Sequence, residues 1–436
     1  MQQHVYPAAM TRKPGRRTGL LVGLLATSFG MLSACNGGSD DRASNDQLVA
    51  EGRQVFRYDT FGDEAFWTGT LRMNEVIQQA VDPVTALSVG LKVDVEALPD
   101  AVVAGIRDGT VDLSSTQTTL ALLELDAVVG LKGQVETSID GVKRLTQVGI
   151  TCALCHSTVS EDVEIRDLAG NVLIPAGNVG RRLDGWPNRD LDPGAIIALS
   201  PVVAGGPSEA YFKSWGPGKF DPRHNVDNRE DYAVVIPPAF GLSGLSRSTF
   251  TGDGDTAHEP AGPVAYWNRY VSVVEMGGQG TFSDPRLPLN VDHTNGGVLQ
   301  DLVTGELPAL QAYQYSLAAP AAPSGSFEAG AALRGKALFE GQAQCASCHS
   351  GPNFTDANES LHAVGDSAAA KTTYASRSAT KLWRTTPLRG IWQHPPYFHD
   401  GSAATLADVV NAYNAKLNLG LTEEQKADLV EYMKSL

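Results

Sequence analysis

Two short stretches of the chain share the pattern Cys-x-x-Cys-His, and they constrain the fold more than any other feature. They are Cys152–His156 (CALCH) and Cys345–His349 (CASCH). This pattern is the attachment signature of c-type haem: two thiols add to the haem vinyl groups, and the adjacent imidazole ligates the iron. The sequence therefore predicts two covalent haems, with the following attachment and ligand residues: Cys152, Cys155, Cys345 and Cys348 as attachment points, and His156 and His349 as proximal ligands.

The cysteine count supports this prediction. The chain has 5 cysteines, and the fifth, Cys35, lies far upstream of both motifs. A redox-active disulfide would not need the histidine that follows each pair. Structural zinc needs four ligands from nearby pairs, and no second Cys/His pair is close in sequence to either motif. Haem attachment is the interpretation that uses every residue of both motifs.

The N-terminus predicts export. A basic stretch at 12–17 precedes an apolar run at 19–26 that is too short to span a membrane, as in a signal peptide. The following Leu32–Cys35 (LSAC) resembles the lipobox of bacterial lipoproteins, in which the cysteine is lipidated; a plain signal peptide is the alternative. We expect a signal peptide at 1–35 and a flexible Gly/Ser-rich tether at 36–47. Cys35 would anchor the protein to the periplasmic side of the outer membrane.

An internal repeat organises the rest of the chain, whose 436 residues suggest two or three domains. The repeated stretches are Gly52–Phe56 with Gly335–Phe339 before the motifs, and Pro237–Gly241 and Thr249–Gly254 with Arg384–Gly390 and Pro396–Gly401 after them. We predict a mainly α fold of two cytochrome c-like domains, the N-terminal one enlarged by long insertions and loops. The expected bounds are an N-terminal haem domain at 48–316, a linker at 317–327 and a C-terminal cytochrome c domain at 328–436.

Helix signals are clearest near the C-terminus. Apolar residues spaced three and four apart predict a helix over 405–417 with a buried face, which includes Tyr413 and Leu417. Thr405 is suited to cap its start. A last helix should begin at Thr422, with Gln425 completing a capping box. In the enlarged N-terminal part, the apolar stretch 119–129 is also expected to be helical.

Further motifs resemble a known family. They are Arg384–Gly390 (RTTPLRG), Pro395–Leu406 (PPYFHDGSAATL) and Val274–Gly277 (VEMG). Together with the two Cys-x-x-Cys-His motifs, they resemble the bacterial di-haem cytochrome c peroxidase and MauG superfamily. The resemblance implies one haem for catalysis and one for electron entry. The long N-terminal part, with Gly194–Ile197, resembles more finely the rubber-oxygenase-related branch.

The resemblance implies a catalytic pocket at the first haem. Glu275 corresponds to the distal-pocket segment, where a carboxylate can move a proton between the two oxygens of peroxide. In the alternative interpretation, Glu275 forms an ion pair with Arg269. The rubber-oxygenase branch implies that Trp267 and Phe282 line the pocket; otherwise they are core aromatics.

The spacing of histidines bears on the first iron. No histidine follows His156 until His224, whereas family members with a closed, bis-histidine first haem have one much nearer. The resemblance therefore implies an open sixth position at this iron. His224, His258 and His293 are alternative ligands, although we expect each to lie in a loop or outside the first coordination sphere. Met276 is expected to pack.

At the second haem, the resemblance places Tyr413 where MauG has a tyrosine ligand; the alternative is that its ring packs on the buried helix face. His399 is expected beside the haem edge as a supporting group. Arg384 and Arg389 suit the haem propionates, because guanidinium groups bind carboxylates well.

The sequence departs from the family between the haems. Short peroxidases carry a tryptophan in the aromatic-Asp-Gly turn of the N-terminal unit, and here Thr251 takes that place. Trp186 or Trp267 are candidate replacements in the electron path. The family also implies calcium between the domains, bound here by backbone carbonyls near His394 and Pro396.

These features predict an oxidoreductase that reduces hydrogen peroxide at the N-terminal haem. Electrons would enter at the C-terminal haem from a small redox protein or a quinol-derived donor. Two alternatives stay open: an oxygenase that uses dioxygen to cleave an organic, polyisoprene-like substrate, and a non-enzymatic electron carrier. The net charge of −15 excludes a nucleic-acid partner. Only a lipid anchor would contact the membrane, and a homodimer is left open.

Overall fold

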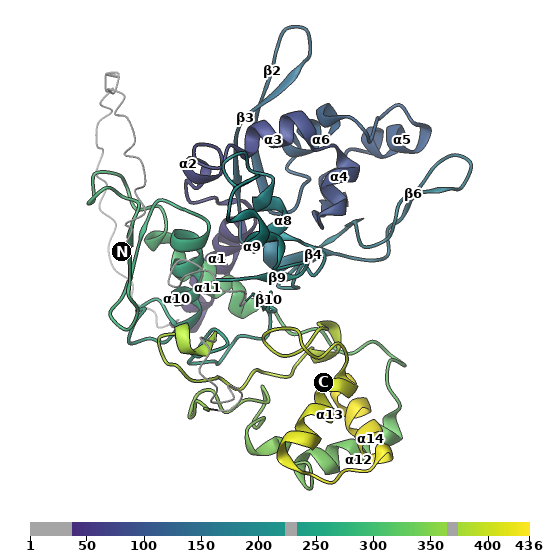
Figure 1. Cartoon of the computed structure of the whole chain (residues 1–436), viewed down its shortest axis with the longest axis vertical. Coiled ribbons are helices and arrows are strands. Elements are labelled where there is room, and N and C mark those ends of the chain that lie inside the picture. Colours follow the sequence, from purple (N-terminus) through teal and green to yellow (C-terminus); the bar gives the residue numbers. More distant parts are fainter. Residues whose placement is uncertain (1–36, 223–232, 364–373) are drawn as a thin grey trace. The chain divides into compact units, whose positions relative to one another are not determined.

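The computed structural model describes residues 37–222, 233–363 and 374–436 (Figure 1). The chain divides into two units, Met1–Arg42 and Ala43–Leu436. Helices make up 38% and strands 13% of the structure, in keeping with a mainly α fold. Both Cys-x-x-Cys-His motifs lie in the second unit.

Helices of four to 22 residues supply most of the framework. The α-helices are α1 (Gly37–Tyr58), α2 (Glu64–Trp67), α3 (Met73–Ala80), α4 (Pro83–Ser88), α5 (Asp100–Asp108), α6 (Thr116–Glu124), α7 (Ala153–His156), α8 (Pro193–Ala198), α9 (Glu209–Lys213), α10 (Pro263–Tyr270), α11 (Leu307–Ser316), α12 (Ala329–Glu340), α13 (Leu406–Leu417) and α14 (Glu423–Lys434).

Short strands pair two by two. They are β1 (Val93–Asp94), β2 (Leu131–Thr137), β3 (Lys143–Ile150), β4 (Ser157–Val159), β5 (Ile165–Arg166), β6 (Val172–Ile174), β7 (Val179–Gly180), β8 (Arg182–Asp184), β9 (Lys219–Phe220), β10 (Val234–Val235), β11 (Thr281–Asp284) and β12 (Leu289–Asp292). β1 and β7 are parallel, and the pairs β2–β3, β4–β8, β5–β6, β9–β10 and β11–β12 are antiparallel. Figure 1 shows the β2–β3 and β5–β6 hairpins extending beyond the neighbouring helices.

The repeated Gly-x-x-x-Phe pattern marks the same helix contact twice. In α1, a Cβ at Gly52 would overlap the backbone of α11, and Phe56 packs edge-on against Tyr313 at 5.5 Å between ring centroids. In α12, a Cβ at Gly335 would overlap the carbonyl oxygen of Asp428 in α14. There too an aromatic pair follows: the phenylalanine four residues on packs against Tyr432 at 5.3 Å. The glycine lets two helix backbones approach closely, and the aromatic pair fills the space beside them.

The segment between α1 and the first motif builds a core of its own. Helices α3 and α6 pack against the β2–β3 hairpin, whose register pairs Leu131 with Ile150. Ile150 contacts both this core and the core around α1, α10 and α11. The enlarged part is therefore joined to the haem-motif region through shared apolar side chains.

Capping at the C-terminal helices agrees with the sequence. Thr405 and Asp408 form a capping box at α13, and Thr422 and Gln425 form one at α14. The signals are local, since each box uses only a four-residue window.

Three expectations differ from the structure. The tether expected at 36–47 is helical from Gly37 on. The helix expected over 119–129 ends at Glu124. On α13, Leu406 and Val410 are buried, but Tyr413 is 38% and Leu417 is 50% exposed, so the predicted buried face is incomplete.

The expected linker, 317–327, forms no helix or strand. It is held at Leu317, whose carbonyl accepts from the Gly241 amide, and at Pro320, whose carbonyl accepts from the Trp392 indole. Among the helices that the structure describes, none is long and apolar enough to cross a membrane.

The helix contact at Gly335 generates a stability prediction. Gly335→Ala should lower the free energy of unfolding by about 1–3 kcal/mol, because the added methyl group overpacks the α12–α14 contact. Gly305→Ala is the matched control, because a Cβ there meets nothing within 4 Å. Denaturant unfolding of both haem-loaded variants measures the difference, and equal stabilities would contradict the close contact.

Candidate haem sites

The first motif lies on α7, between β3 and β4. His156 donates from Nδ1 to the carbonyl of Pro237 over 3.0 Å, and burial lowers the pKa of the imidazole to about 4. A neutral ring whose Nδ1 carries the proton presents Nε2 to a metal. The backbone is held as well, because the carbonyls of Cys155 and His156 accept from the amides of Asn188 and Gly185 at 2.9 and 2.8 Å.

The second motif repeats this arrangement on a shorter loop. Its 3₁₀ turn, η4, spans Cys345–Ser347. His349 donates from Nδ1 to the carbonyl of Phe354 over 3.0 Å, and burial lowers its pKa. Both proximal histidines therefore have the same tautomer, oriented by a backbone carbonyl.

The four motif cysteines form no disulfide. Burial raises the pKa of Cys152 and Cys155 to about 12, and that of Cys345 to about 11. Paired, protonated thiols next to a neutral imidazole fit covalent haem attachment. Cys152 borders the core around α1, α10 and α11, whereas Cys155 borders the core of the insertion.

A rival ligand set lies beside the second motif. Ligand atoms of Cys348, Asp356 and His362 lie within 4.8 Å of one another. His362 already pairs with Asp356 at 2.8 Å. Three groups fall short of the four ligands of structural zinc, and the haem interpretation accounts for Cys348 together with its neighbours.

The segments that carry the predicted catalytic residues share an apolar core with the first motif. Glu275 ends a π-helical turn, η2 (Val271–Glu275), that continues α10, and both its carboxylate oxygens are buried. Trp267 stacks on Tyr270 at 5.5 Å, and Phe282 packs edge-on against the same ring at 5.0 Å. This aromatic group shares an apolar core with Ala153 of the motif. π-Helical turns are frequent at functional sites.

The turn after Glu275 is tightly held. Gly277 has a positive φ of 84°, and a Cβ there would overlap the ring of Phe66. The indole of Trp67 donates to the carbonyl of Met276 over 3.0 Å. Arg269, the ion-pair partner in the alternative interpretation, bonds to Glu259 at 2.5 Å and to Thr304 at 2.7 Å.

The other candidate ligands lie elsewhere or bond to other groups. His258 pairs with Asp255 at 2.6 Å, and His293 lies 3.0 Å from the carbonyl of Gly278. Met276 is buried, as expected for packing. His224 lies outside the described residues.

At the second motif, Tyr413 lies near the thiols of Cys345 and Cys348. Burial, and to a lesser extent these thiols, raise the pKa of its phenol, which therefore stays protonated at neutral pH. Tyr413 is 38% exposed, and its ring centroid lies 6.0 Å from that of Phe398. An exposed ring beside the motif fits contact with an apolar haem face. His399 packs against Trp383 in a tilted arrangement, with ring centroids 4.3 Å apart.

Arg384 and Arg389, the two arginines expected to bind haem propionates, differ in burial and in hydrogen-bond partners. Arg384 donates from Nε to the Thr249 carbonyl over 2.7 Å, but its Nη1 is buried without a partner among the described residues. Burial lowers its pKa to about 10. A buried donor of this kind fits a haem propionate. Arg389 is exposed, donates to the Pro352 carbonyl and lies over the ring of Phe354, so its observed contacts support the loop around His349 instead.

The segment between the motifs contains a tryptophan pair. Trp186 packs edge-on against Trp392, with ring centroids 6.1 Å apart. Trp392 lies on the turn η6 (Ile391–Gln393), whose first residue belongs to the C-terminal core. Thr251 is fully buried, and its carbonyl accepts from the Thr380 hydroxyl. Sequence analysis missed Trp392, because it gives no local sign of its distant partner.

The proposed calcium region is positively charged. Burial, and then the neighbouring Arg189, lower the pKa of His394 to about 3. Arg189 is itself buried enough to lower its own pKa to about 10. The positive charge of Arg189 acts on His394 and therefore disfavours a divalent cation beside it.

Comparisons with known proteins agree with the haem interpretation. Residues 332–436 match the cytochrome c family. MauG of Methylorubrum extorquens is 33% identical over 122 residues, which cover 24% of this chain and 34% of that protein. A cytochrome-c peroxidase of Denitromonas iodatirespirans is 30% identical over 188 residues, covering 31% and 50%. The chain thus matches about a third to a half of the length of these relatives.

A solved MauG-like protein associated with microbial copper homeostasis matches 47% of this chain and 73% of its own, at 19% identity. Its TM-score of 0.31 is too low to carry an argument.

The C-terminal domain and the geometry of the histidines define a c-type cytochrome with covalently bound haem. The matches to MauG and to a cytochrome-c peroxidase show that parts of the chain are similar to the di-haem cytochrome c peroxidase/MauG family.

Haem content provides a direct prediction. The mature protein should carry two haems per chain, measured by the pyridine haemochrome and by the intact mass. A Cys345→Ala, Cys348→Ala double variant should lose one haem and retain the other at Cys152 and Cys155. One haem in the unaltered protein would show that only one motif is an attachment site.

Proposed function

We propose that the protein reduces hydrogen peroxide at the haem of the first motif, with electrons entering through the haem of the second. The observation that carries this proposal is the position of Glu275. Its buried carboxylate ends a π-helical turn within the apolar surroundings of the first motif. A carboxylate at this position, on the segment that packs with the first motif, is suited to proton transfer there.

Glu275 would supply the proton transfer. Haem, when bound, supplies an iron that can exchange electrons with peroxide. Reduction of one H₂O₂ to two H₂O consumes two electrons and two protons. A carboxylate can take the proton from one peroxide oxygen and deliver it to the other, the leaving oxygen. Val273, Val274 and Met276 are buried around it and limit the access of bulk water.

Other residues position the proximal histidine and the segment that carries Glu275. The Pro237 carbonyl fixes the His156 ring and increases its basicity as a ligand. Trp67 and Gly277 fix the backbone beside Glu275. Trp267, Tyr270 and Phe282 form an apolar wall in the same core.

Electrons would pass through the tryptophan pair. Trp186 lies between Gly185 and Asn188, which hydrogen-bond to the first motif, and it contacts Trp392 of the C-terminal part. Trp267 packs against Tyr270, within the N-terminal core. These contacts favour Trp186 over Trp267 as the replacement for the missing turn tryptophan.

The cellular setting is part of the proposal. We infer an exported protein, anchored at Cys35 to the periplasmic side of the outer membrane. The electron donor would be a small redox protein or a quinol-derived carrier. Residues 1–35 lie outside the part that the structure describes, so these inferences rest on the sequence pattern alone.

The acid/base role gives the first functional prediction. The protein is examined by electron paramagnetic resonance in its ferric form and again after one-electron reduction. In one of these two forms it should show a high-spin iron signal, which should disappear when a stoichiometric amount of peroxide is added. Glu275→Gln should slow this reaction roughly 10²- to 10⁴-fold, because the amide cannot accept the proton. Stopped-flow absorbance measures the rate.

Glu306→Gln is the matched control, because Glu306 lies at the start of α11 and takes no part in the proposed pocket. An unchanged rate in Glu275→Gln would exclude the acid/base role. Two low-spin signals that ignore peroxide would identify an electron carrier instead of an enzyme.

The electron path gives a second prediction. Trp186→Leu should leave the reaction with peroxide unchanged and slow the subsequent re-reduction of the first haem by the second. Trp186→Phe keeps an aromatic ring beside Trp392 and should retain more of the rate. Stopped-flow traces at the two haem bands separate the steps, and equal re-reduction in all three proteins would rule out this path.

A further inference from the structure

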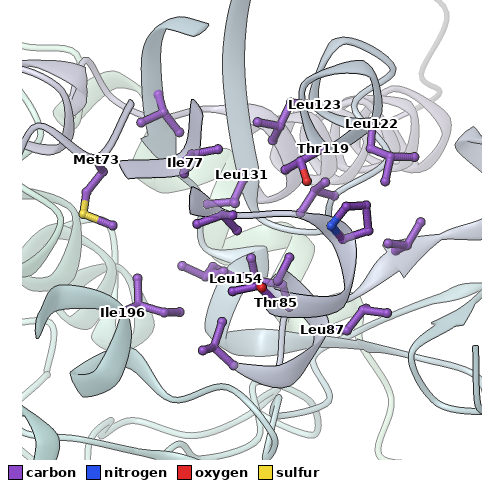
Figure 2. Close-up of a pocket in the computed structure, with 18 of the residues that line it drawn as sticks. Met73, Ile77, Thr85, Leu87, Thr119, Leu122, Leu123, Leu131, Leu154 and Ile196 are labelled. Carbon is purple, nitrogen blue, oxygen red and sulfur yellow. The ribbon is translucent and has the colours of Figure 1, made fainter. Parts of the chain in front are cut away.

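The insertion before the first motif encloses a cavity of about 90 Å³ (Figure 2). Its walls come from helices α3, α4, α5, α6 and α8, from the β2–β3 hairpin, and from the first motif itself. Figure 2 shows side chains such as Ile77, Leu131 and Leu154 surrounding a common space. Protein interiors are close-packed and hold few voids larger than a water molecule, so this space is unusual for a structural core.

The wall is apolar throughout. Its accessible surface contains no polar atoms, and Thr85 and Thr119 are the only hydroxyl-bearing residues in the lining. The Thr119 hydroxyl is buried. The Trp67 indole is directed elsewhere, since it donates to the Met276 carbonyl. A water molecule needs two to four polar partners, which this wall does not offer, so the cavity is dry.

The cavity touches the first haem site at two points. Leu154, which lines it, lies between the two cysteines of the first motif, and Cys155 packs against the same core. Trp67, which also lines it, is hydrogen-bonded to the residue after Glu275. An occupant would therefore lie beside both the haem attachment segment and the segment that carries the proposed acid/base group.

We propose that this cavity binds a small, neutral, apolar molecule, between dioxygen and benzene in size, next to the first haem. The dry apolar surface selects against ions and polar molecules, because they would lose their hydration without compensation. The size follows from volume: an engineered apolar cavity of about 150 Å³ takes up benzene or xenon, and the present one is smaller. The site goes beyond peroxide reduction and does not depend on it.

The test uses the full-length, haem-loaded protein and two probes, xenon and benzene. Each ligand that binds the folded state raises the melting temperature with its concentration. Xenon-129 chemical shifts report the same binding independently. A response to xenon alone supports a dissolved gas as occupant, and a response to both supports a small hydrocarbon. No response to either probe overturns the proposal.

Ala86→Leu tests the location, because Ala86 lines the cavity and an isobutyl group in place of its methyl fills the space. Both responses should be lost in this variant. Ala101→Leu makes the same change at an exposed position on α5 and should keep them. If Ala86→Leu does not fold, Val93→Leu is the milder filling variant. Retained binding in a folded filling variant places the occupant elsewhere and overturns the assignment.

Peroxide turnover serves as a separate measurement in these variants. Loss of probe binding in Ala86→Leu with an intact peroxide reaction supports the cavity as an independent site. Failure of the peroxide reaction in the unaltered protein, with xenon or benzene still bound, would reject the proposed activity and leave the cavity assignment standing.

Discussion

Each haem site depends on one hydrogen bond, from the Nδ1 of a proximal histidine to a backbone carbonyl. The bond fixes the tautomer and turns Nε2 toward the place of the iron. At the second site the carbonyl of Phe354 is five residues away from His349; at the first, the carbonyl of Pro237 is 81 residues from His156. The second site is therefore completed locally, within a compact cytochrome domain. The first requires the long region after its motif to fold before its ligand is oriented.

This difference explains why the N-terminal part can grow without losing the haem motif. Closing a longer loop costs little additional entropy, so large segments can be inserted if their ends are held. Here the ends are held by apolar packing: Ile150 belongs to both cores, and the two cysteines of the first motif border different ones. The added segment thus forms the apolar cavity beside the first motif. The α1–α11 contact nevertheless has the same form as the α12–α14 contact.

Features written within a few residues of sequence could be predicted, and features that depend on distant partners could not. The cap at Thr405, the capping box at Thr422 and the Gly-x-x-x-Phe repeat were predicted, because their residues lie within one or two helical turns. Glu275, Trp267 and Phe282 were singled out through the family resemblance, and the structure shows that Trp267 and Phe282 both pack against Tyr270. The Trp186–Trp392 contact joins residues 206 positions apart, so sequence alone showed only one partner. The contacts of Arg389 were missed for the same reason, since they depend on how the loop around His349 folds.

Charge at the junction of the two halves connects fold and cofactor. Arg377 and Asp221 form a buried ion pair that is neutral as a unit. Arg384 and Arg189 differ from Arg377, because each has a buried nitrogen and forms no salt bridge among the described residues. Burying a cation without an ion-pair partner is costly. The chain has a net charge of −15 and therefore many carboxylates, yet none pairs with these two arginines among the described residues. The guanidinium groups of Arg384 and Arg189 are therefore suited to bind the anionic propionates of haem. Haem loading and the docking of the two halves would then stabilise each other, because the propionates neutralise charges that the docked halves would otherwise bury alone.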